Sequence, residues 1–176
     1  HENWLPSVAR IAFGSPNLLG VRYGGVTMFD LLRESYRQNP DYVIVVEVRG
    51  KEASVLFQGM ASGHPSLGTF HAESLETMIR RLETPPISLP RSLVDSLDVV
   101  CSMVHYKDKD KHFRRVNELI EIIEIGTTSG TIKKNTAFKW DPVQDKLTTS
   151  EDYHLIKRIS AKTGISIKKL LRELDL

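Results

Sequence analysis

The apolar run at residues 42–48, YVIVVEV, limits the possible folds more than any other segment of this chain. Its first five positions are all apolar, and four of them are valine or isoleucine. β-Branched residues favour strands, and a strand without polar alternation is typical of a parallel sheet covered by helices on both sides. We therefore predict a strand at 42–48 that is buried on both faces.

Helical patterns and a second strand surround this run. The predicted elements are a helix that is capped by Thr27 and ends at Asn39-Pro40, a helix over 53–61, a strand over 67–72, and a helix that is capped by Ser74 and ends at Pro85-Pro86. Helices that alternate with strands in this way favour an α/β layer fold.

The composition changes after Pro90, so we divide the chain into a domain at 1–90 and an α+β subdomain at 91–176. The predicted elements are a helix over 91–96, a strand over 98–106, a strand over 112–126, a hairpin turned at Asp141-Pro142, and two helices capped by Ser150 and Ser166. The strand at 112–126 is ambiguous, because its glutamates recur at a helical spacing while its β-branched residues favour a strand.

Charge and composition exclude several classes of function. The net charge is only +2, with both signs interspersed, which argues against direct binding of nucleic acid. No apolar run approaches the ~20 residues that a membrane-spanning helix needs. The single cysteine, Cys101, lies in an apolar segment and is predicted to be a core residue in a reducing compartment. The chain opens at His1 without methionine, so we expect an internal or processed piece of a longer protein.

Polar residues follow both predicted strands of the first domain. Glu47 ends the first strand and is followed by Arg49, Gly50 and Glu52, while His71 ends the second. Ligands of open α/β sheets bind beyond the carboxyl ends of strands, where a carboxylate can hold hydrated Mg²⁺ or orient an attacking water. An imidazole there can donate to a phosphate. Charge capping of a strand end and a structural histidine are the alternatives.

Other chemistries fit the sequence less well. The spacing of His64, His71, Glu73 and His105 matches neither an H-E-x-x-H helix nor a closed zinc set, and no G-x-S-x-G segment is present. Residues 20–27, GVRYGGVT, have glycines at the spacing of a phosphate-binding loop, but Val26 replaces its lysine and no strand precedes it. The sequence therefore contains no primary phosphate cradle.

Five segments of the chain carry a family resemblance, beginning with EVRGKEA at 47–53 and GHPSLGTFHAES at 63–74. These two resemble the Walker B segment and the histidine box of the secretion ATPase family, whose members drive type II and type IV secretion, type IV pili and archaella. RRLETPPISLPRSL and FKWDPVQDKL are most similar to the archaeal branch, and HENWLPSVAR is similar to the stretch after the family's aspartate box. The resemblance implies the C-terminal half of a RecA-like three-layer core without its Walker A strand, loop and helix.

The resemblance also implies roles for individual residues. Glu47 would be the Walker B carboxylate near Mg²⁺ and water, Glu52 a second acidic position, and His71 the histidine near the terminal phosphate. Arg49 and Gly50 belong to the same motif and are expected near the nucleotide. Arg80 and Arg81 match an arginine-containing helix with a nucleotide or subunit contact, although a solvated helix face is the alternative.

Two departures from the family qualify these expectations. Val46 stands where the family usually has glycine, and Walker A and the aspartate box are absent from this chain. Because backbone amides and a lysine supply most phosphate binding in such sites, we expect the chain alone to bind nucleotide weakly and to be inactive.

The resemblance implies a parent protein that binds ATP and Mg²⁺, forms a hexamer, and drives a membrane-embedded platform protein from the cytoplasmic face of the membrane. A non-catalytic docking or oligomerisation module of the same machine is the alternative, favoured by Val46 and the missing loop. DNA translocation is a third possibility, which the near-neutral charge disfavours.

Overall fold

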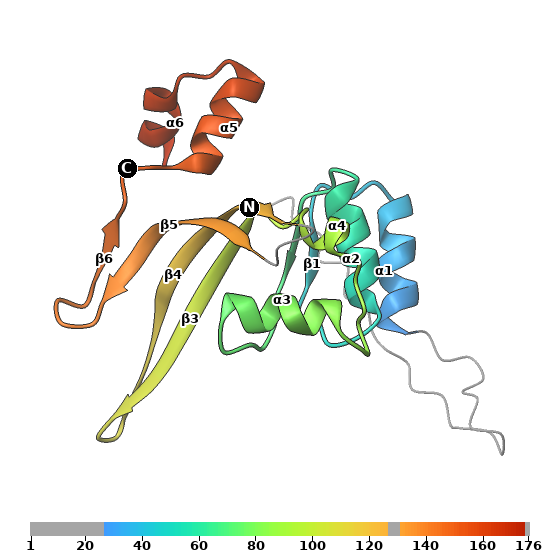
Figure 1. Cartoon of the computed structure of the whole chain (residues 1–176), viewed down its shortest axis with the longest axis horizontal. Helices are drawn as coiled ribbons and strands as arrows, with labels where there is room; N and C mark the ends of the chain where they lie inside the picture. The colour runs from blue at the N-terminus through green and yellow to red at the C-terminus, as the bar shows by residue number, and fades with distance from the viewer. Residues whose placement is uncertain (1–26, 127–130, 175–176) are drawn as a thin grey trace. The chain divides into compact units, whose positions relative to one another are not determined.

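The computed structural model describes residues 27–126 and 131–174 of the chain (Figure 1). The chain divides into two compact units, and each unit contains its own sheet. The first unit comprises described residues 27–72 and 78–89, and the second comprises 73–77, 90–126 and 131–174. The mixture of helices and strands confirms the predicted α/β class.

The first unit is built on two parallel strands connected by a helix. Its elements are α1 (Met28–Arg37), β1 (Val43–Val45), α2 (Glu52–Ala61), β2 (Ser66–Gly68) and the C-terminal part of α3 (Leu75–Glu83). The predicted cap of α1 is confirmed, because Thr27 Oγ1 accepts from Asp30 N at 3.2 Å and Asp30 Oδ2 accepts from Thr27 N at 3.1 Å. Strands β1 and β2 pair in parallel with Ile44 opposite Leu67.

Burial of β1 alternates between its two faces. Val43 and Val45 are buried, whereas Ile44 is 57% exposed and Val46 is 79% exposed. The prediction of burial on both faces is therefore wrong for the described part of the chain. The buried face packs on α2, where Leu56 lies so close that a Cβ atom at Gly68 would be 3.1 Å from its Cδ2.

Tyr36 of α1 connects three elements of the first unit. A Cβ atom at Gly59 of α2 would lie 2.1 Å from the Tyr36 ring, so glycine is needed for this approach. The Tyr36 hydroxyl lies 3.2 Å from Ser66 Oγ on β2. Burial raises the pKa of Tyr36 although the Ser66 hydrogen bond lowers it. The ring thus fixes α1 and α2 against the strand pair.

The second unit contains a four-stranded antiparallel sheet in the order β3-β4-β5-β6. Its elements are α4 (Arg91–Val94), β3 (Val99–Asp108), β4 (Lys111–Ile125), β5 (Ile132–Asp141), β6 (Lys146–Thr149), α5 (His154–Thr163) and α6 (Ile167–Glu173). The strand assigned to the ambiguous segment 112–126 is confirmed, and so is the hairpin at Asp141-Pro142. Figure 1 shows β3 and β4 as a long hairpin.

Two predictions for the second unit are wrong. Cys101 is exposed rather than buried, because exposure alternates along β3 and Cys101 belongs to the exposed set with Met103 and His105. Helix α5 begins at His154 and its N-cap is Tyr153, so Ser150 does not cap it. Gly164 ends the helix, with φ of 74°.

A buried glutamate of the sheet caps α5 instead of a local residue. Glu121 on β4 is only 4% exposed, and its carboxylate accepts from His154 N at 2.8 Å and from Leu155 N at 2.9 Å. Asn135 on β5 donates to the same carboxylate at 2.7 Å. Hydrogen bonds and the positive end of the helix thus compensate for burial of the charge.

We predict that Glu121→Ala destabilises the second unit by about 2 kcal/mol, because it leaves two helix N–H groups without their acceptor and removes one of the two acceptors of Asn135. Urea denaturation in a Trp4→Phe background, followed by Trp140 fluorescence, measures this change. Glu118→Ala on the same strand is the control, since its partner Lys139 is largely exposed, and we expect a loss below about 0.5 kcal/mol. Equal losses for the two variants would contradict the capping role.

The contacts of the Asp145 carboxylate predict that the stability of the second unit depends on pH. Arg115 holds both oxygens of Asp145 at 2.7 and 2.8 Å and Trp140 Nε1 donates to it at 2.9 Å, so the pKa of Asp145 falls from 3.8 to about 2. A lowered folded-state pKa gives a contribution to stability that is present above pH 3.8 and is lost as the pH falls through about 2.

An NMR titration of the Asp145 carboxyl carbon should therefore give a midpoint near 2 in the folded chain. Arg115→Met should raise this midpoint, because Arg115 is the largest cause of the shift. Trp140→Phe should raise it less. An unchanged midpoint in Arg115→Met would contradict this account.

Candidate functional site

The pairing of β1 with β2 continues past the ends of both strands through Thr69. Thr69 N donates to Val45 O at 3.3 Å, and Val48 N donates to Thr69 O at 2.9 Å. The Thr69 hydroxyl also donates to Val46 O. The segments that follow the two strands are therefore tied to each other directly, at the carboxyl ends where the sequence predicts a site.

Glu47 and His71 meet at this edge. His71 Nε2 lies 3.2 Å from Glu47 Oε1. The Glu47 side chain is only 28% exposed, whereas the His71 ring is 84% exposed. The predicted juxtaposition of the acid and the imidazole is therefore present, with the acid partly enclosed and the ring accessible to a ligand.

Arg49 makes the second contact of the Glu47 carboxylate. Its Nε donates to Glu47 Oε1, the same oxygen that faces His71. The contacts with Arg49 and His71 both use Oε1. Among the described residues of the first unit, no hydrogen bond or ion pair engages the other carboxylate oxygen, Oε2. That oxygen is the one that can accept from a water molecule or from the hydration shell of a cation.

Glu52 points back to the turn after β1. Its Oε1 accepts from Arg49 N at 2.6 Å and from Gly50 N at 2.7 Å. The backbone amides of both residues are therefore engaged within the protein. Glu52 accepts from backbone amides, whereas Glu47 meets the side chains of Arg49 and His71, so the two acids have different partners.

The two predicted arginines of α3 differ from each other. Arg81 donates through Nη1 to the carbonyl oxygen of His71, and its guanidinium lies 4.9 Å from the centre of the Phe70 ring. Arg80 is exposed, and its carbonyl accepts from the Thr84 hydroxyl. Arg81 is thus close to the Glu47–His71 pair, and the described contacts do not bring the Arg80 side chain to it.

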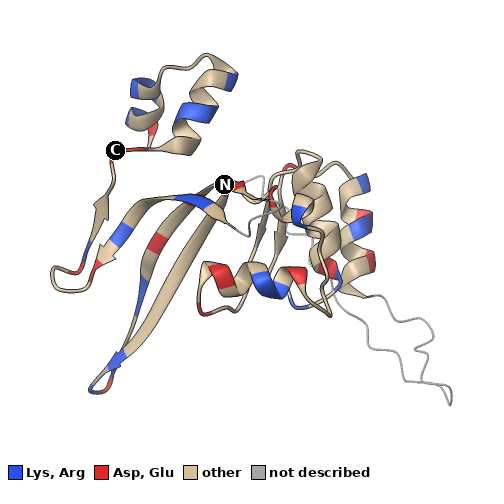
Figure 2. Cartoon of the chain, in the orientation of Figure 1, with Lys and Arg blue, Asp and Glu red and all other residues tan. Residues whose placement is uncertain are grey.

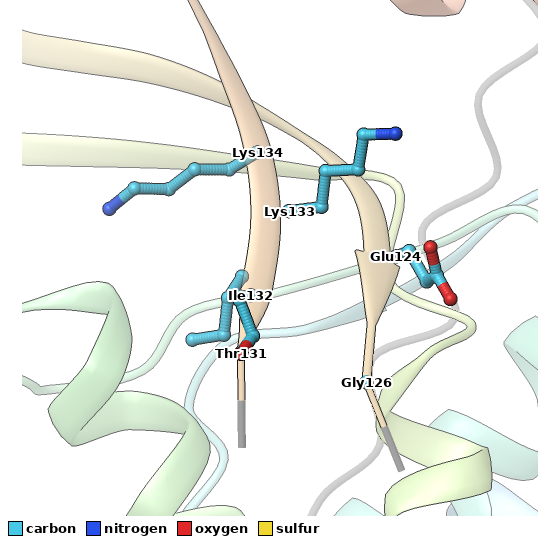
Figure 3. A pocket seen from close by; sticks show the side chains of 6 residues that line it. All are labelled: Glu124, Gly126, Thr131, Ile132, Lys133 and Lys134. Carbon is cyan, nitrogen blue, oxygen red and sulfur yellow. The ribbon is translucent and has the colours of Figure 1, made fainter. Parts of the chain in front are cut away.

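The remaining candidates do not form a site in the described residues. No group of three or more His, Cys, Asp or Glu residues there is placed to hold a metal ion. A shallow depression lies where β4 and β5 meet residues 126 and 131 (Figure 3). Figure 3 shows the side chains of Lys133 and Lys134 pointing apart, and Lys134 Nζ is paired with Glu76 at 2.8 Å. These lysines therefore do not converge on a ligand.

The candidate site lies within a segment that matches a known protein family. Residues 18–143 match the model of the family described as type II/IV secretion system protein. This chain belongs to that family. The matched range includes Glu47, His71 and the whole of the first unit's described sheet.

Relatives of this secretion-system family member come from archaea and bacteria. The protein MJ1287 of Methanocaldococcus jannaschii is 39% identical over 99% of this chain, which spans 62% of that relative's length. The conjugal transfer protein TrbB of Rhizobium radiobacter is 31% identical over 55% of the chain and 31% of its own length. The type IV secretion system protein PtlH of Bordetella pertussis is 30% identical over 56% of the chain and 32% of its own length.

Thr69 is a site residue that the sequence analysis did not single out. Its signal in the sequence is weak, because a threonine between Gly68 and Phe70 also suits an ordinary strand. Only the pairing register shows that its hydroxyl reaches the peptide next to Glu47. The stretch HENWLPSVAR and the loop at 20–26, which the sequence analysis also discussed, lie outside the described residues.

We predict that Thr69→Val loosens the site without unfolding the first unit. Valine has nearly the same shape but cannot donate to Val46 O, so the Val48 amide, which donates to Thr69 O, should exchange about fivefold faster, as expected for loss of ~1 kcal/mol. Hydrogen exchange by NMR measures this rate. Thr84→Val removes a hydroxyl bond to Arg80 O at the C-terminal end of α3 and should leave Val48 unchanged. Equal effects of both variants would contradict a specific role of Thr69.

Proposed function

We propose that this chain carries the Walker B acid and the sensing histidine of an ATP-hydrolysing motor in a secretion, pilus or archaellum assembly machine of archaeal type. The observation that carries the proposal is the 3.2 Å contact between Glu47 and His71 at the carboxyl ends of two parallel strands. Membership in the type II/IV secretion system protein family supports it.

Glu47 is the residue that we assign to water activation. Its Oε1 is engaged by Arg49 and His71, which fixes the orientation of the carboxylate and leaves Oε2 to accept from the attacking water. A carboxylate that is 28% exposed still reaches solvent, so water can approach it. Arg49 places a positive charge beside this acid and donates to it through Nε.

His71 is the residue that we assign to the terminal phosphate. Its ring is 84% exposed and lies beside the acid, so Nε2 can leave Glu47 and donate to a phosphate oxygen. This exchange of partners would make the Glu47 contacts depend on whether the phosphate is present. We infer that the histidine thereby links hydrolysis to the conformation of the segment after β2.

The donor set also fits Mg²⁺. Magnesium retains most of its water and is bound by one or two carboxylates together with substrate phosphates. A single partly exposed carboxylate oxygen at Glu47, without a dedicated cluster of acids among the described residues, suits such a cation. Mg²⁺ would neutralise phosphate charge, and Glu47 would hold it through water.

ATP binding requires more than these residues supply. A G-x-x-x-x-G-K-[ST] loop is absent from the 176 residues, and the amides of Arg49 and Gly50 are engaged by Glu52. We therefore propose that ATP and Mg²⁺ bind in a longer protein that supplies this loop, and that the present chain alone does not turn over ATP. This chain spans 62% of the Methanocaldococcus relative, which has room for such a segment.

A motor of this kind also needs binding partners and a defined place in the cell. We propose a hexameric ring that acts on a membrane-embedded platform protein from the cytoplasmic face of the membrane. In the described residues, no helix combines the length and the apolar composition needed to span a bilayer. On α1 and α3, Lys and Arg are mixed with Asp and Glu (Figure 2), so neither of these two helices carries a purely basic set of charges.

A docking or oligomerisation module without catalysis is the second candidate function. The apolar side chains on the open face of the β1–β2 sheet favour it, because exposed apolar groups that cluster on one face mark contact surfaces. These residues are Tyr42, Ile44, Val46 and Leu67, each more than half exposed. ATP turnover by the longer protein separates the two candidates.

We predict that Glu47→Gln in the longer protein lowers kcat for ATP hydrolysis by at least about 100-fold, because the amide cannot accept a proton or hold the water as the carboxylate does. Binding of a fluorescent ATP analogue should change by less than about threefold, since phosphate binding rests mainly on the loop. Glu34→Gln on α1 is the control for removal of an exposed acid. Turnover near the wild-type rate in Glu47→Gln would favour the docking module.

A further inference from the structure

The segments that carry Glu47 and His71 are each held by a charged side chain that binds backbone. These side chains are Glu52 and Arg81. Their hydrogen bonds go to backbone atoms and not to Glu47 Oε1 or His71 Nε2, the two atoms that meet in the pair. Exposed ion pairs in water contribute little, typically ~0–1 kcal/mol, because both side chains lose conformational freedom when they meet. The 3.2 Å contact at a ring that is 84% exposed therefore needs support from the backbone on both sides.

Glu52 supplies the support on the Glu47 side. Its Oε1 accepts from Arg49 N at 2.6 Å and from Gly50 N at 2.7 Å, so one oxygen fixes two consecutive peptides. The fit is close, because a Cβ atom at Gly50 would lie 3.3 Å from Glu52 Oε2. Arg49, whose peptide is fixed in this way, donates from Nε to Glu47. Glu52 thus acts on Glu47 indirectly, by fixing the backbone of Arg49, whose side chain contacts Glu47.

Arg81 supplies the support on the His71 side. Its guanidinium donates to the His71 carbonyl oxygen and lies 4.9 Å from the centre of the Phe70 ring. Two consecutive residues of the segment after β2 are therefore held by one side chain of α3. Arginine suits this position because its planar group can stack on a ring while its N–H groups donate sideways.

We infer that Glu52 and Arg81 are positioning residues, which hold Glu47 and His71 in contact without acting on the nucleotide themselves. Glu52 acts as a hydrogen-bond acceptor rather than as a second catalytic acid. Arg81 acts as a clamp on the histidine segment rather than as a nucleotide or subunit contact. The inference concerns geometry within the first unit, and only its catalytic meaning rests on the proposed function.

The role of Glu52 is tested by comparing Glu52→Gln with Glu52→Ala in the 176-residue chain. Glutamine keeps the acceptor oxygen and loses the charge, so the Arg49 and Gly50 amides should exchange within about threefold of the wild-type rate. Alanine removes the acceptor, and these amides should exchange at least about tenfold faster. The Leu89 amide, which donates to Leu82 O at 2.8 Å, is the internal reference.

Two results would overturn the role of Glu52. The first is a glutamine variant that exchanges as fast as the alanine variant, because the charge and not the acceptor would then matter. The second is an alanine variant that accelerates Leu89 as much as Arg49, because the loss would then be general unfolding rather than release of one turn.

The role of Arg81 is tested through the chemical shift of the His71 ring. In the wild-type background, Glu47→Gln should change the His71 Cε1–H shift, because the two side chains are in contact. In Arg81→Ala, the same substitution should change that shift by less than half as much. Arg80→Ala is the matched control from the same helix and should preserve the full change. A full change in Arg81→Ala would overturn the clamp.

These measurements need no nucleotide, so their outcome is independent of turnover. If the exchange and shift results hold while Glu47→Gln hydrolyses ATP normally, the positioning role stands and the proposed motor function fails. If the shifts do not respond to Arg81 while Glu47→Gln abolishes turnover, the motor function stands and the positioning role is rejected.

Discussion

The parallel pairing of β1 with β2 is the interaction on which the candidate site depends. Parallel strands joined by a helix point in the same direction, so the residues that follow them emerge at one edge of the sheet. Thr69 extends the pairing by one further step through two backbone hydrogen bonds and its hydroxyl. Glu47 and His71 lie 24 positions apart in the sequence, and this pairing gives them a common location. Charge attraction at an exposed pair is too weak to do so.

Much of the first unit could be predicted from local patterns. The cap at Thr27, the β-branched run at 42–48 and the polar residues after each strand depend on neighbours within a few positions, so the sequence contains the relevant information. The placement of Glu47 beside His71 also followed, because parallel strands have only one carboxyl edge. Residues whose partners come from other elements were harder to interpret. The family resemblance drew attention to Glu52 and Arg81, yet their contacts with Gly50 and with the His71 carbonyl depend on side-chain direction.

In the second unit, predictions from local sequence were wrong where the structure depends on contacts between distant segments. Ser150 is a good capping residue by type, but α5 begins at His154 because Glu121, 33 positions earlier, supplies the acceptor. A buried glutamate in an otherwise apolar run indicates a tertiary partner but does not identify it. Cys101 was placed in the core because its neighbours are apolar, and it is exposed because every second residue of β3 from Cys101 to Lys107 is exposed. In a run that is apolar throughout, local composition cannot show which of the two faces will be covered.

The incomplete burial of β1 connects the fold to the function. Its composition is that of a strand covered on both faces, yet Ile44 and Val46 remain exposed while Val43 and Val45 are buried. A motor domain and a docking module explain this face differently, since one covers it with a further layer of the same domain and the other with a partner. In either case the cover would meet Ile44 and Val46, whose side chains share the open face. Successive side chains of an extended segment point to opposite faces, so sequence adjacency to Val46 does not by itself bring the cover to the Glu47 carboxylate. The contacts that fix the acid are instead those of Arg49 and His71, and they form in the first unit whether its open face is covered or not.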